Sequence, residues 1–333
     1  MMRVFIQHVR FVLLLLALAG VCEGSSWGQD VVIPSTSCAT SKGRRPGLDE
    51  TVNLINAQLF EAAECSAREL TASQPDSADA HYLLAYVLNR RDKADDSLKE
   101  YTTAAKYRTP SPNDLAVVAL DYALLKDYMD AGKWMTQALI GDSKNALYWY
   151  YLGRIRYTAN AFDKAREAFE QALRLAPNDT RDLYNLGLTY EGLGEAEHAA
   201  SFYRQAIASE QGSLLHDAQP YYDLGSLLSR QNETAEALSL LQRAAALDPR
   251  NPAIHEQLAK AEEQMGQLAA SKADLEFAVA LAPNVGSLHF ELGRVYQKLR
   301  MTVEAKQQFD LCSKMTETHS SIGSDSLDFT RRQ

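Results

Sequence analysis

The sequence predicts an all-α fold, a right-handed superhelical solenoid of about eight helix-turn-helix repeats, and three observations support this prediction. Similar segments begin every 34 residues along most of the chain. Small residues recur at two fixed positions of these segments, and a proline recurs near the end of several of them. A fixed period of this length is typical of stacked helical pairs, in which each repeat contacts only its neighbours.

The clearest repeat is the segment 146–179, which contains two short amphipathic helices joined by a turn. Gly153 marks the first helix, and Ala165 and Phe169 mark the second, before Pro177 ends the unit. Counted from this segment, repeats begin at residues 44, 78, 112, 146, 180, 218, 252 and 286, the sixth after four additional residues. The predicted solenoid therefore covers residues 44–319, and residues 320–333 are predicted to form a flexible tail.

Two columns of small residues indicate where the helices of each pair approach each other. Position eight is occupied by Thr51, Ala85, Ala119, Gly153, Gly187, Gly225, Ala259 and Gly293. Position twenty is occupied by Ala63, Ser97, Ala131, Ala165, Ala199, Ala237, Ser271 and Ala305. Antiparallel helices pack closely only where side chains are small, and larger residues at positions seven and twenty-four fill the space beside these contacts. Proline at position thirty-two stops the second helix.

This pattern resembles the tetratricopeptide repeat family over residues 44–319. The resemblance is most specific in repeats four to six and eight, and weaker in the first, where Gly47 and Glu50 stand at normally apolar positions and the first helix is expected to be short. It implies that the first helix of each repeat lines a concave surface, with positions two, five, nine, twelve and thirteen facing into it. It also implies a non-enzymatic scaffold that binds a protein or peptide.

The predicted groove carries a ladder of tyrosines with scattered arginines. Tyr and Arg suit peptide recognition, because the ring covers apolar surface and the guanidinium pairs with a carboxylate. The alternative is that these tyrosines pack against their neighbours and only solvate their hydroxyl groups. The candidate groove residues are Tyr82, Tyr86, Arg90, Tyr150, Arg154, Tyr157, Tyr184, Asn185, Tyr222, Arg230, Phe290 and Arg294. The Lys and Asn clamp that chaperone-type members of the family use for a terminal carboxylate is not expected here.

The N-terminal residues 1–28 are predicted to be a signal peptide. Basic residues precede an apolar run from Phe11 to Val21, which is too short for a confident membrane span and is typical of a signal-peptide core. Cleavage after Ala19 or after Gly28 is possible, and the second leaves a fuller apolar core. Residues 29–43 are predicted to be a leader, and an uncleaved N-terminal anchor is the alternative to export.

The cysteines and histidines point to structure rather than to a metal or cofactor. Export makes a disulfide between Cys38 and Cys65 possible, while Cys312 falls at a packed helix position. The histidines at position four, His81, His255 and His289, belong to separate repeats and stand too far apart to share a zinc ion. They are expected to occupy helix contacts, and neither a metal site nor a cofactor site is predicted.

The remaining features separate the possible classes of function. A net charge of −9 argues against nucleic acid as the main ligand. No phosphate-binding loop, GxSxG or HExxH motif is present, so an enzyme is not predicted. The leading hypothesis is an exported scaffold that binds a protein or peptide in its concave groove. The alternative is an envelope-associated assembly factor that acts through its convex face or its uncapped C-terminal end, for example as a homodimer.

Overall fold

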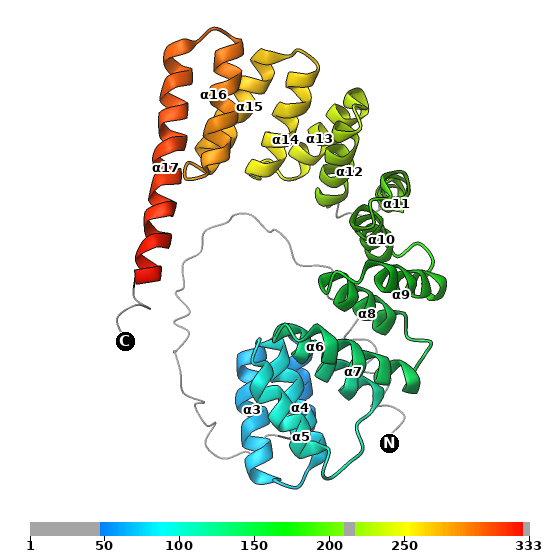
Figure 1. Ribbon diagram of the computed structural model, residues 1–333. Helices are drawn as coiled ribbons and strands as arrows, with labels where there is room; N and C mark the ends of the chain where they lie inside the picture. The colour runs from blue at the N-terminus through cyan, green and yellow to red at the C-terminus, as the bar shows by residue number, and fades with distance from the viewer. Residues whose placement is uncertain (1–46, 210–216, 329–333) are drawn as a thin grey trace, which may run out of the picture. The chain divides into compact units, whose positions relative to one another are not determined.

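A computed structural model describes residues 47–209 and 217–328, and in this part of the chain every regular element is an α-helix (Figure 1). For residues 316–328 only the backbone is described. The chain divides into two units, one up to Lys144 and one from Asn145 onward, and each is described by itself. The predicted signal peptide and leader lie outside the described residues.

The described residues of the first unit form three antiparallel helix pairs. Its helices are α2 (Leu48–Asn56), α3 (Phe60–Ser73), α4 (Ala78–Arg90), α5 (Ala94–Ala104), α6 (Pro112–Leu124) and α7 (Tyr128–Gly141). The helix α2 is short, as the polar residues of the first repeat predict. Both α4 and α6 begin at the residues from which the second and third repeats are counted.

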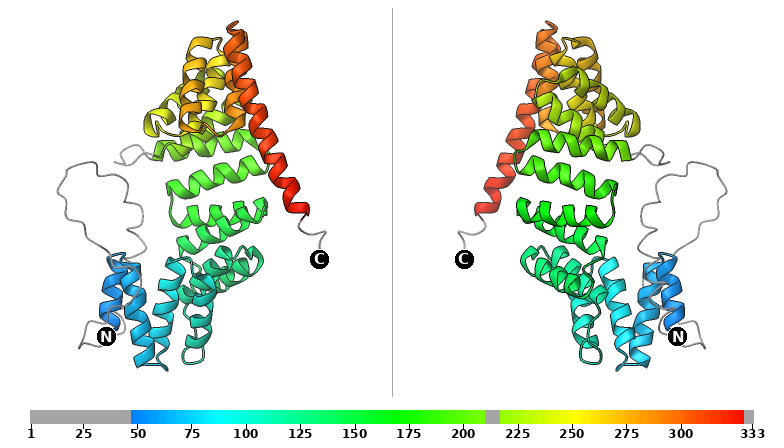
Figure 2. Two further views of the ribbon diagram at one scale, coloured as in Figure 1. Left: turned by 90° about the vertical axis from the view of Figure 1, so that its left-hand side faces the viewer. Right: turned by 90° about the vertical axis from the view of Figure 1, so that its right-hand side faces the viewer.

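The second unit stacks five further helix pairs, seen side-on in Figure 2. Its helices are α8 (Ala146–Thr158), α9 (Phe162–Leu175), α10 (Thr180–Gly192), α11 (Ala196–Ser209), α12 (Gln219–Arg230), α13 (Thr234–Leu247), α14 (Pro252–Gln264), α15 (Leu268–Leu281), α16 (Gly286–Lys298) and α17 (Thr302–Asp328). The predicted counting residue is again the first helical residue in α8, α10, α14 and α16, and α12 begins one residue later.

Local sequence explains why the first helices begin where they do. The side chains of Ser77, Asn145, Asp179 and Asn251 each accept a hydrogen bond from a backbone N–H in the first turn. At α6, Ser111 and Asp114 form a reciprocal capping box. These caps satisfy backbone donors that have no partner within the helix.

The turn between the two helices of each repeat contains a residue in the left-handed conformation, which the columns of small residues do not predict. Position fifteen adopts a positive φ in every repeat, at Gln58, Asp92, Lys126, Asn160, Gly194, Asn232, Gly266 and Arg300. This left-handed conformation ends the first helix and redirects the chain into the second. Only two of these residues are glycines, although glycine adopts this conformation at the lowest cost.

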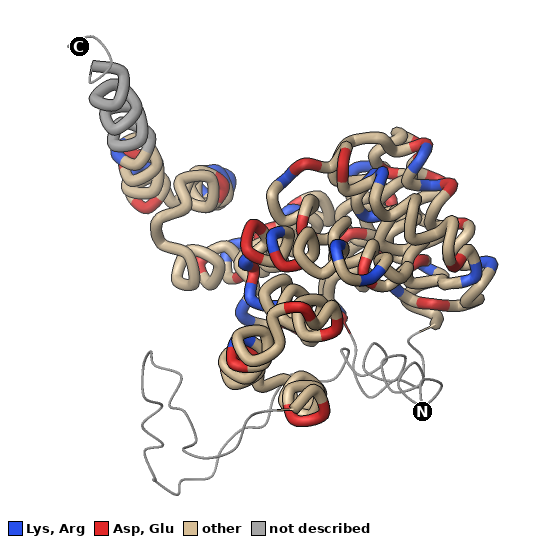
Figure 3. The backbone as a smooth tube through the Cα atoms, turned by 90° about the horizontal axis from the view of Figure 1, so that it is seen from below, with Lys and Arg blue, Asp and Glu red and all other residues tan. Residues whose placement is uncertain are grey.

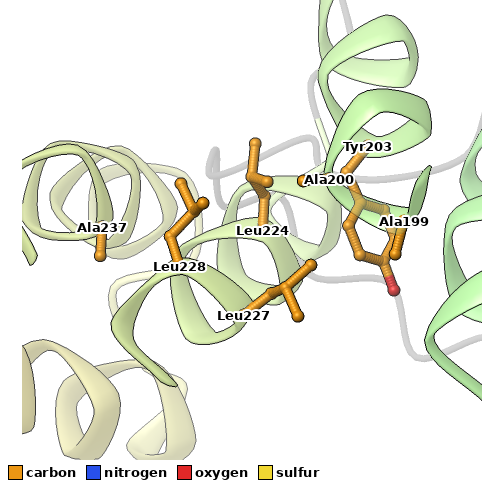
Figure 4. Packing of buried hydrophobic residues seen from close by; sticks show 7 residues of the cluster. All are labelled: Ala199, Ala200, Tyr203, Leu224, Leu227, Leu228 and Ala237. Carbon is orange, nitrogen blue, oxygen red and sulfur yellow. The ribbon is translucent and has the colours of Figure 1, made fainter. Parts of the chain in front are cut away.

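The helix contacts follow the predicted columns. At Gly153, an added Cβ atom would lie 2.6 Å from the ring of Phe169, which is fully buried at position twenty-four of the same repeat. The absence of a side chain at position eight therefore makes room for the large residue opposite. Between successive repeats, Tyr203 of α11 packs with leucines of α12, as Figure 4 shows for the cluster Ala199, Ala200, Tyr203, Leu224, Leu227, Leu228 and Ala237.

The last helix runs past residue 319, where the solenoid was predicted to end, and the flexibility of residues 320–333 stays a prediction. The backbone of α17 remains helical to Asp328. Position thirty-two of the last repeat is Glu317, whereas Pro75, Pro177, Pro249 and Pro283 stand there in four other repeats. No proline therefore interrupts this helix. Among the described residues, no helix has the length and apolar character that a membrane span requires.

The structure describes Cys65 and Cys312, but it does not describe Cys38, the predicted disulfide partner of Cys65. Cys65 in α3 is engaged in a disulfide bond, whereas Cys38 lies outside the described residues, so their pairing stays a prediction. Cys312 is half-buried on α17, and its Sγ would lie 3.8 Å from a Cβ atom added at Gly286 of α16. This places Cys312 at the contact between the two helices of the last repeat.

Candidate functional site

A concavity in the described part of the second unit lies along the first helices of repeats five to eight. These helices, α10, α12, α14 and α16, line a pocket of about 550 Å³. The lining residues are Glu191, Tyr222, Asp223, Ser226, Ser229, Arg230, Gln257, Lys260, Glu263, Gln264 and Arg294. All of them come from first helices, which is the surface that the resemblance predicted to be concave.

The register of α12 explains how this helix presents its polar side chains to the pocket. Tyr222, Ser226 and Arg230 are spaced four residues apart, so they form one stripe along the helix. Leu224 and Leu228 are buried on the opposite side, where α12 packs against its neighbours. The apolar stripe fixes the rotation of the helix and leaves the polar stripe on the pocket wall.

Acidic and basic residues are interspersed along the described helices (Figure 3), and within the pocket they form pairs. Arg230 contacts Glu191 of α10, across one repeat boundary. Arg294 Nη2 lies 3.1 Å from Glu263 Oε1, which Lys298 also contacts. These pairs connect neighbouring first helices, so the charged groups that line the pocket also help to fix its width.

One carboxylate of the pocket has a different environment. Asp223 accepts a hydrogen bond from the Tyr184 hydroxyl at 2.7 Å and another from Gln219 Nε2 at 3.1 Å. Burial, followed by smaller effects that include the nearby Glu191 and Asp217, raises the pKa of Asp223, while its two hydrogen bonds lower it in part. In the described part of the chain, no Lys or Arg forms an ion pair with Asp223.

Tyrosines around the pocket use their hydroxyl groups to hold its carboxylates. The Tyr184 hydroxyl bonds to Asp223, and the Tyr203 hydroxyl donates to Glu191 Oε2 at 2.9 Å. Burial is the main cause that raises the pKa of both phenols, and the adjacent carboxylates add to it. The phenols therefore remain protonated and act as donors to the acidic groups of the groove.

Among the predicted groove residues of the second unit, Tyr222, Arg230 and Arg294 line the pocket. Tyr184 supports it through Asp223. Asn185 donates its amide to the backbone oxygen of Arg181 on its own helix. Three of the predicted residues thus line the pocket and others do not, while their role in binding a partner stays a prediction.

At the end of the last repeat, Phe290 is 47% exposed, and its ring lies against that of Phe309. This residue does not line the pocket. It occupies the predicted groove position, but the structure shows it only as a partly exposed ring packed on the second helix of its own repeat.

The predicted residues of α8 form a separate aromatic cluster. The Tyr150 ring packs against that of Phe169, and the guanidinium groups of Arg154 and Arg181 lie 5.9 Å and 5.1 Å from its centroid. Tyr157 packs edge-on against Phe162. These contacts show the packing that the alternative interpretation predicted, and partner binding by this helix stays a prediction.

In the first unit, Tyr82 requires a correction. It is only 5% exposed, and its hydroxyl donates to the backbone oxygen of Arg108 at 2.8 Å. The Arg108 guanidinium covers the ring at 4.4 Å from the centroid. Tyr82 is therefore a core residue and is not available to a partner, because the segment after α5 folds over it. Tyr86 is half-buried in the same core cluster.

Arg90 is the candidate of the first unit that remains exposed. Its guanidinium lies 5.3 Å from the centroid of the Phe60 ring on α3. Such a contact holds the charge beside an aromatic face and leaves it in contact with solvent.

The sequence prediction missed Asp223 and Gln257, which occupy position six, and Glu191 and Glu263, which occupy position twelve. The positions expected to face inward included position twelve but not position six. Polar residues at the same position of adjacent repeats were the available signal. This signal is weak, because polar residues are common on any exposed helix face.

The position-four histidines have a shared structural role. In His81, His255 and His289, Nδ1 bonds to a polar side chain of the second helix of the repeat. In each case Nε2 donates to the backbone oxygen of the position-thirty-two proline of the preceding repeat, at 2.9–3.0 Å. The rings thus connect successive repeats. Within the described ranges, no group of three His, Cys, Asp or Glu residues could hold a metal ion.

Several protein-family models and curated proteins match parts of this chain. Models described as tetratricopeptide repeat match residues 53–114, 146–179, 183–212 and 218–261. The chain is 25% identical over 203 residues to anaphase-promoting complex subunit 3 of Schizosaccharomyces pombe, covering 60% of this chain and 30% of that protein. It is 29% identical over 160 residues to the BBSome complex member BBS4 of Xenopus tropicalis, covering 48% and 26%. The matches thus span less than a third of either relative.

Solved structures show the same fold. The Cut9–Hcn1 hetero-tetramer of the APC/C matches with a TM-score of 0.53 and 15% identity, covering 81% of this chain and 53% of that one. PilW, described as a type IV pilus biogenesis factor, matches with a TM-score of 0.53 and 22% identity, covering 59% and 90%. At these identities the likeness concerns the architecture of stacked helix pairs.

Proposed function

Because this chain belongs to the tetratricopeptide repeat family, whose fold serves as a scaffold for protein–protein interaction, we propose that it binds an extended peptide segment of a partner protein in the pocket of repeats five to eight. The observation that carries the proposal is the pocket of about 550 Å³ on the inner helices of these repeats. Its wall combines an aromatic ring, uncharged polar groups and paired charges, which are the elements of a peptide-binding surface.

The pocket is better suited to binding than to catalysis. Its arginines are held in ion pairs with carboxylates, and its buried phenols are held as hydrogen-bond donors by acidic neighbours. The hydroxyl of Ser229 on the pocket wall donates to the Gln264 amide oxygen at 3.1 Å, which is not a general base. We therefore propose a non-enzymatic role, in which side chains of the partner occupy the pocket and its backbone crosses the first helices.

The proposal includes export of the chain through its N-terminal segment. The support is the apolar run after the basic N-terminal residues, in residues 1–28. Export would place the groove in the periplasm or outside the cell, where a disulfide at Cys65 is chemically favoured. An uncleaved segment that anchors the chain to the membrane is the alternative.

A peptide selection experiment tests the binding proposal. A random peptide library is panned against the full chain, and the selected peptides are titrated against the wild type and a Ser226→Arg variant. Ser226 occupies position nine, where Arg154 and Arg294 stand in other repeats, so the fold accommodates arginine there. Its longer side chain fills the pocket, and we expect the affinity to fall at least about tenfold, roughly 1.4 kcal/mol.

The matched control is Ile140→Arg, which adds the same side chain on α7 at a site that is 73% exposed and far from the pocket in sequence. This variant should bind the peptides as the wild type does. Failure to select any peptide, or equal binding by the wild type and Ser226→Arg, would contradict the proposal.

A further inference from the structure

Three basic and three acidic residues line the pocket, and the way they pair indicates the chemistry of its ligand. Arg230, Lys260 and Arg294 line the pocket, and each already contacts a carboxylate of the chain. The partners are Glu191 for Arg230, Glu256 for Lys260 and Glu263 for Arg294. An acidic ligand would therefore have to compete with ion pairs that are already formed.

Asp223 is the pocket-lining carboxylate whose hydrogen bonds come only from neutral donors in the described residues. The Tyr184 hydroxyl and the Gln219 amide donate to it, while its charged neighbours Glu191 and Asp217 are also acidic. A half-buried carboxylate in these surroundings gains from a cation, because burial weakens its hydration and like charges repel it. A ligand that brings a positive charge supplies what the pocket lacks.

The aromatic ring beside Asp223 points to the same chemistry. Tyr222 occupies position five of its repeat, and the equivalent tyrosines of two other repeats each hold an arginine of the chain over the ring. The distances from guanidinium carbon to ring centroid are 4.4 Å for Arg108 on Tyr82 and 5.1 Å for Arg181 on Tyr150. Among the described residues, no Lys or Arg occupies this place over Tyr222.

We propose that the pocket receives a basic side chain, Lys or Arg, of the partner peptide, with Asp223 as its ion-pair acceptor and Tyr222 as the aromatic surface beside it. This inference rests on the proposed function and specifies the class of peptide. Both side chains line the same pocket, where the carboxylate offers an ion-pair acceptor and the ring offers a cation–π surface to a guanidinium or ammonium group. The Tyr184 hydroxyl holds the carboxylate in place, because it bonds to the Oδ2 atom.

The test uses the peptides selected by panning on the wild-type chain. Lys or Arg should be enriched at one position of these peptides. Replacing that residue with its neutral analogue, norleucine for lysine or citrulline for arginine, should weaken binding to the wild type about tenfold, as expected for loss of one favourable ion pair. The Asp223→Asn variant should lose most of this preference, since its side chain carries no charge and only the Tyr222 ring still favours the cation.

Two controls make the result specific. Asp223→Asn retains an oxygen that can accept from Tyr184, and its thermal unfolding curve checks that the repeat stays folded. Asp163→Asn removes a carboxylate from α9 that is 74% exposed, and it should keep the preference of the wild type for the basic peptide.

The outcomes separate this inference from the proposed function. Selected peptides without an enriched basic residue would overturn the inference, as would a preference for the basic peptide that is as strong in Asp223→Asn as in the wild type. If those same peptides lose affinity for Ser226→Arg, groove binding still stands. If panning yields no peptide at all, the proposed function fails, and the inference fails with it.

Discussion

Replacing Asp121 with asparagine should stabilise the first unit at pH 8, because the surroundings of this carboxyl group are complete only when it carries a proton. Asp121 is fully buried on α6, and its Oδ1 accepts from Asn89 Nδ2 at 2.8 Å. Its Oδ2 lies 2.6 Å from Ser97 Oγ, which also lies 2.9 Å from the carbonyl oxygen of Ala85. One hydroxyl proton cannot serve both acceptors, so a proton on Oδ2 completes the network.

The magnitude follows from the pKa. Burial, the largest cause, raises the pKa of Asp121 from 3.8 to about 7. Between about pH 4 and pH 7, the folded chain keeps a proton that the unfolded chain releases, so the free energy of unfolding falls as the pH rises through this window. Three pKa units at about 1.36 kcal/mol each give an upper limit of about 4 kcal/mol for the penalty above pH 7.

Asparagine removes this penalty, because its amide N–H donates to Ser97 in place of the proton. Urea denaturation should therefore show Asp121→Asn to be more stable than the wild type by up to about 4 kcal/mol at pH 8, and by less than about 1 kcal/mol at pH 4. Hydrogen exchange should locate the gain in α4 to α6, since repeat proteins open locally.

The exposed Asp163→Asn substitution serves as the control and should show no such pH dependence. If Asp121→Asn destabilised the chain at both pH values, or changed its stability equally at both, Asp121 would have to be ionised in the folded chain. The account of the hydrogen-bond network given above would then be refuted.

Two further predictions concern packing and processing. Gly153→Ala should lower the free energy of unfolding by about 1–3 kcal/mol, because the new methyl group overlaps Phe169; Gly132→Ala, with open space around it, should raise it by up to about 1 kcal/mol. Thermal unfolding compares the two, and shifts of the same sign would contradict the packing argument. If the chain is exported, mass spectrometry of the mature protein should find residues 1–28 removed, and a mature chain that begins at Met1 would contradict cleavage.

The helix pairs could be predicted because their signals are local and repeated. Small residues at positions eight and twenty, and proline at position thirty-two, constrain packing directly. The left-handed residue at position fifteen was not predicted, because Lys126 and Arg300 stand there in some repeats and carry no sequence signal for a positive φ. Neighbouring packing determines the conformation at these residues, and the cost of about 1–2 kcal/mol is offset elsewhere.

The candidate site could be predicted only as a face of the helices. Tyr222 and Arg230 lie on one face of α12 because of the helical period, so this face could be predicted from the sequence. The burial of Tyr82 was not, because it depends on Arg108, a residue 26 positions later that folds back over the ring. Equivalent positions of a repeat differ in exposure wherever a connecting segment covers one of them.

The ion pairs of the pocket could not be predicted from the sequence either. They show that the tyrosines at position five do not all have the same role. As a ladder of rings, Tyr184 and Tyr222 are interchangeable surfaces for a peptide. In the structure, Tyr184 uses its hydroxyl to hold Asp223, while Tyr222 lies on the pocket wall. Position five therefore has two roles in adjacent repeats, since Tyr184 orients an acidic group and Tyr222 lines the pocket. If the groove binds a peptide as we propose, its selectivity depends on which carboxylate lacks a cation, and less on the number of aromatic rings.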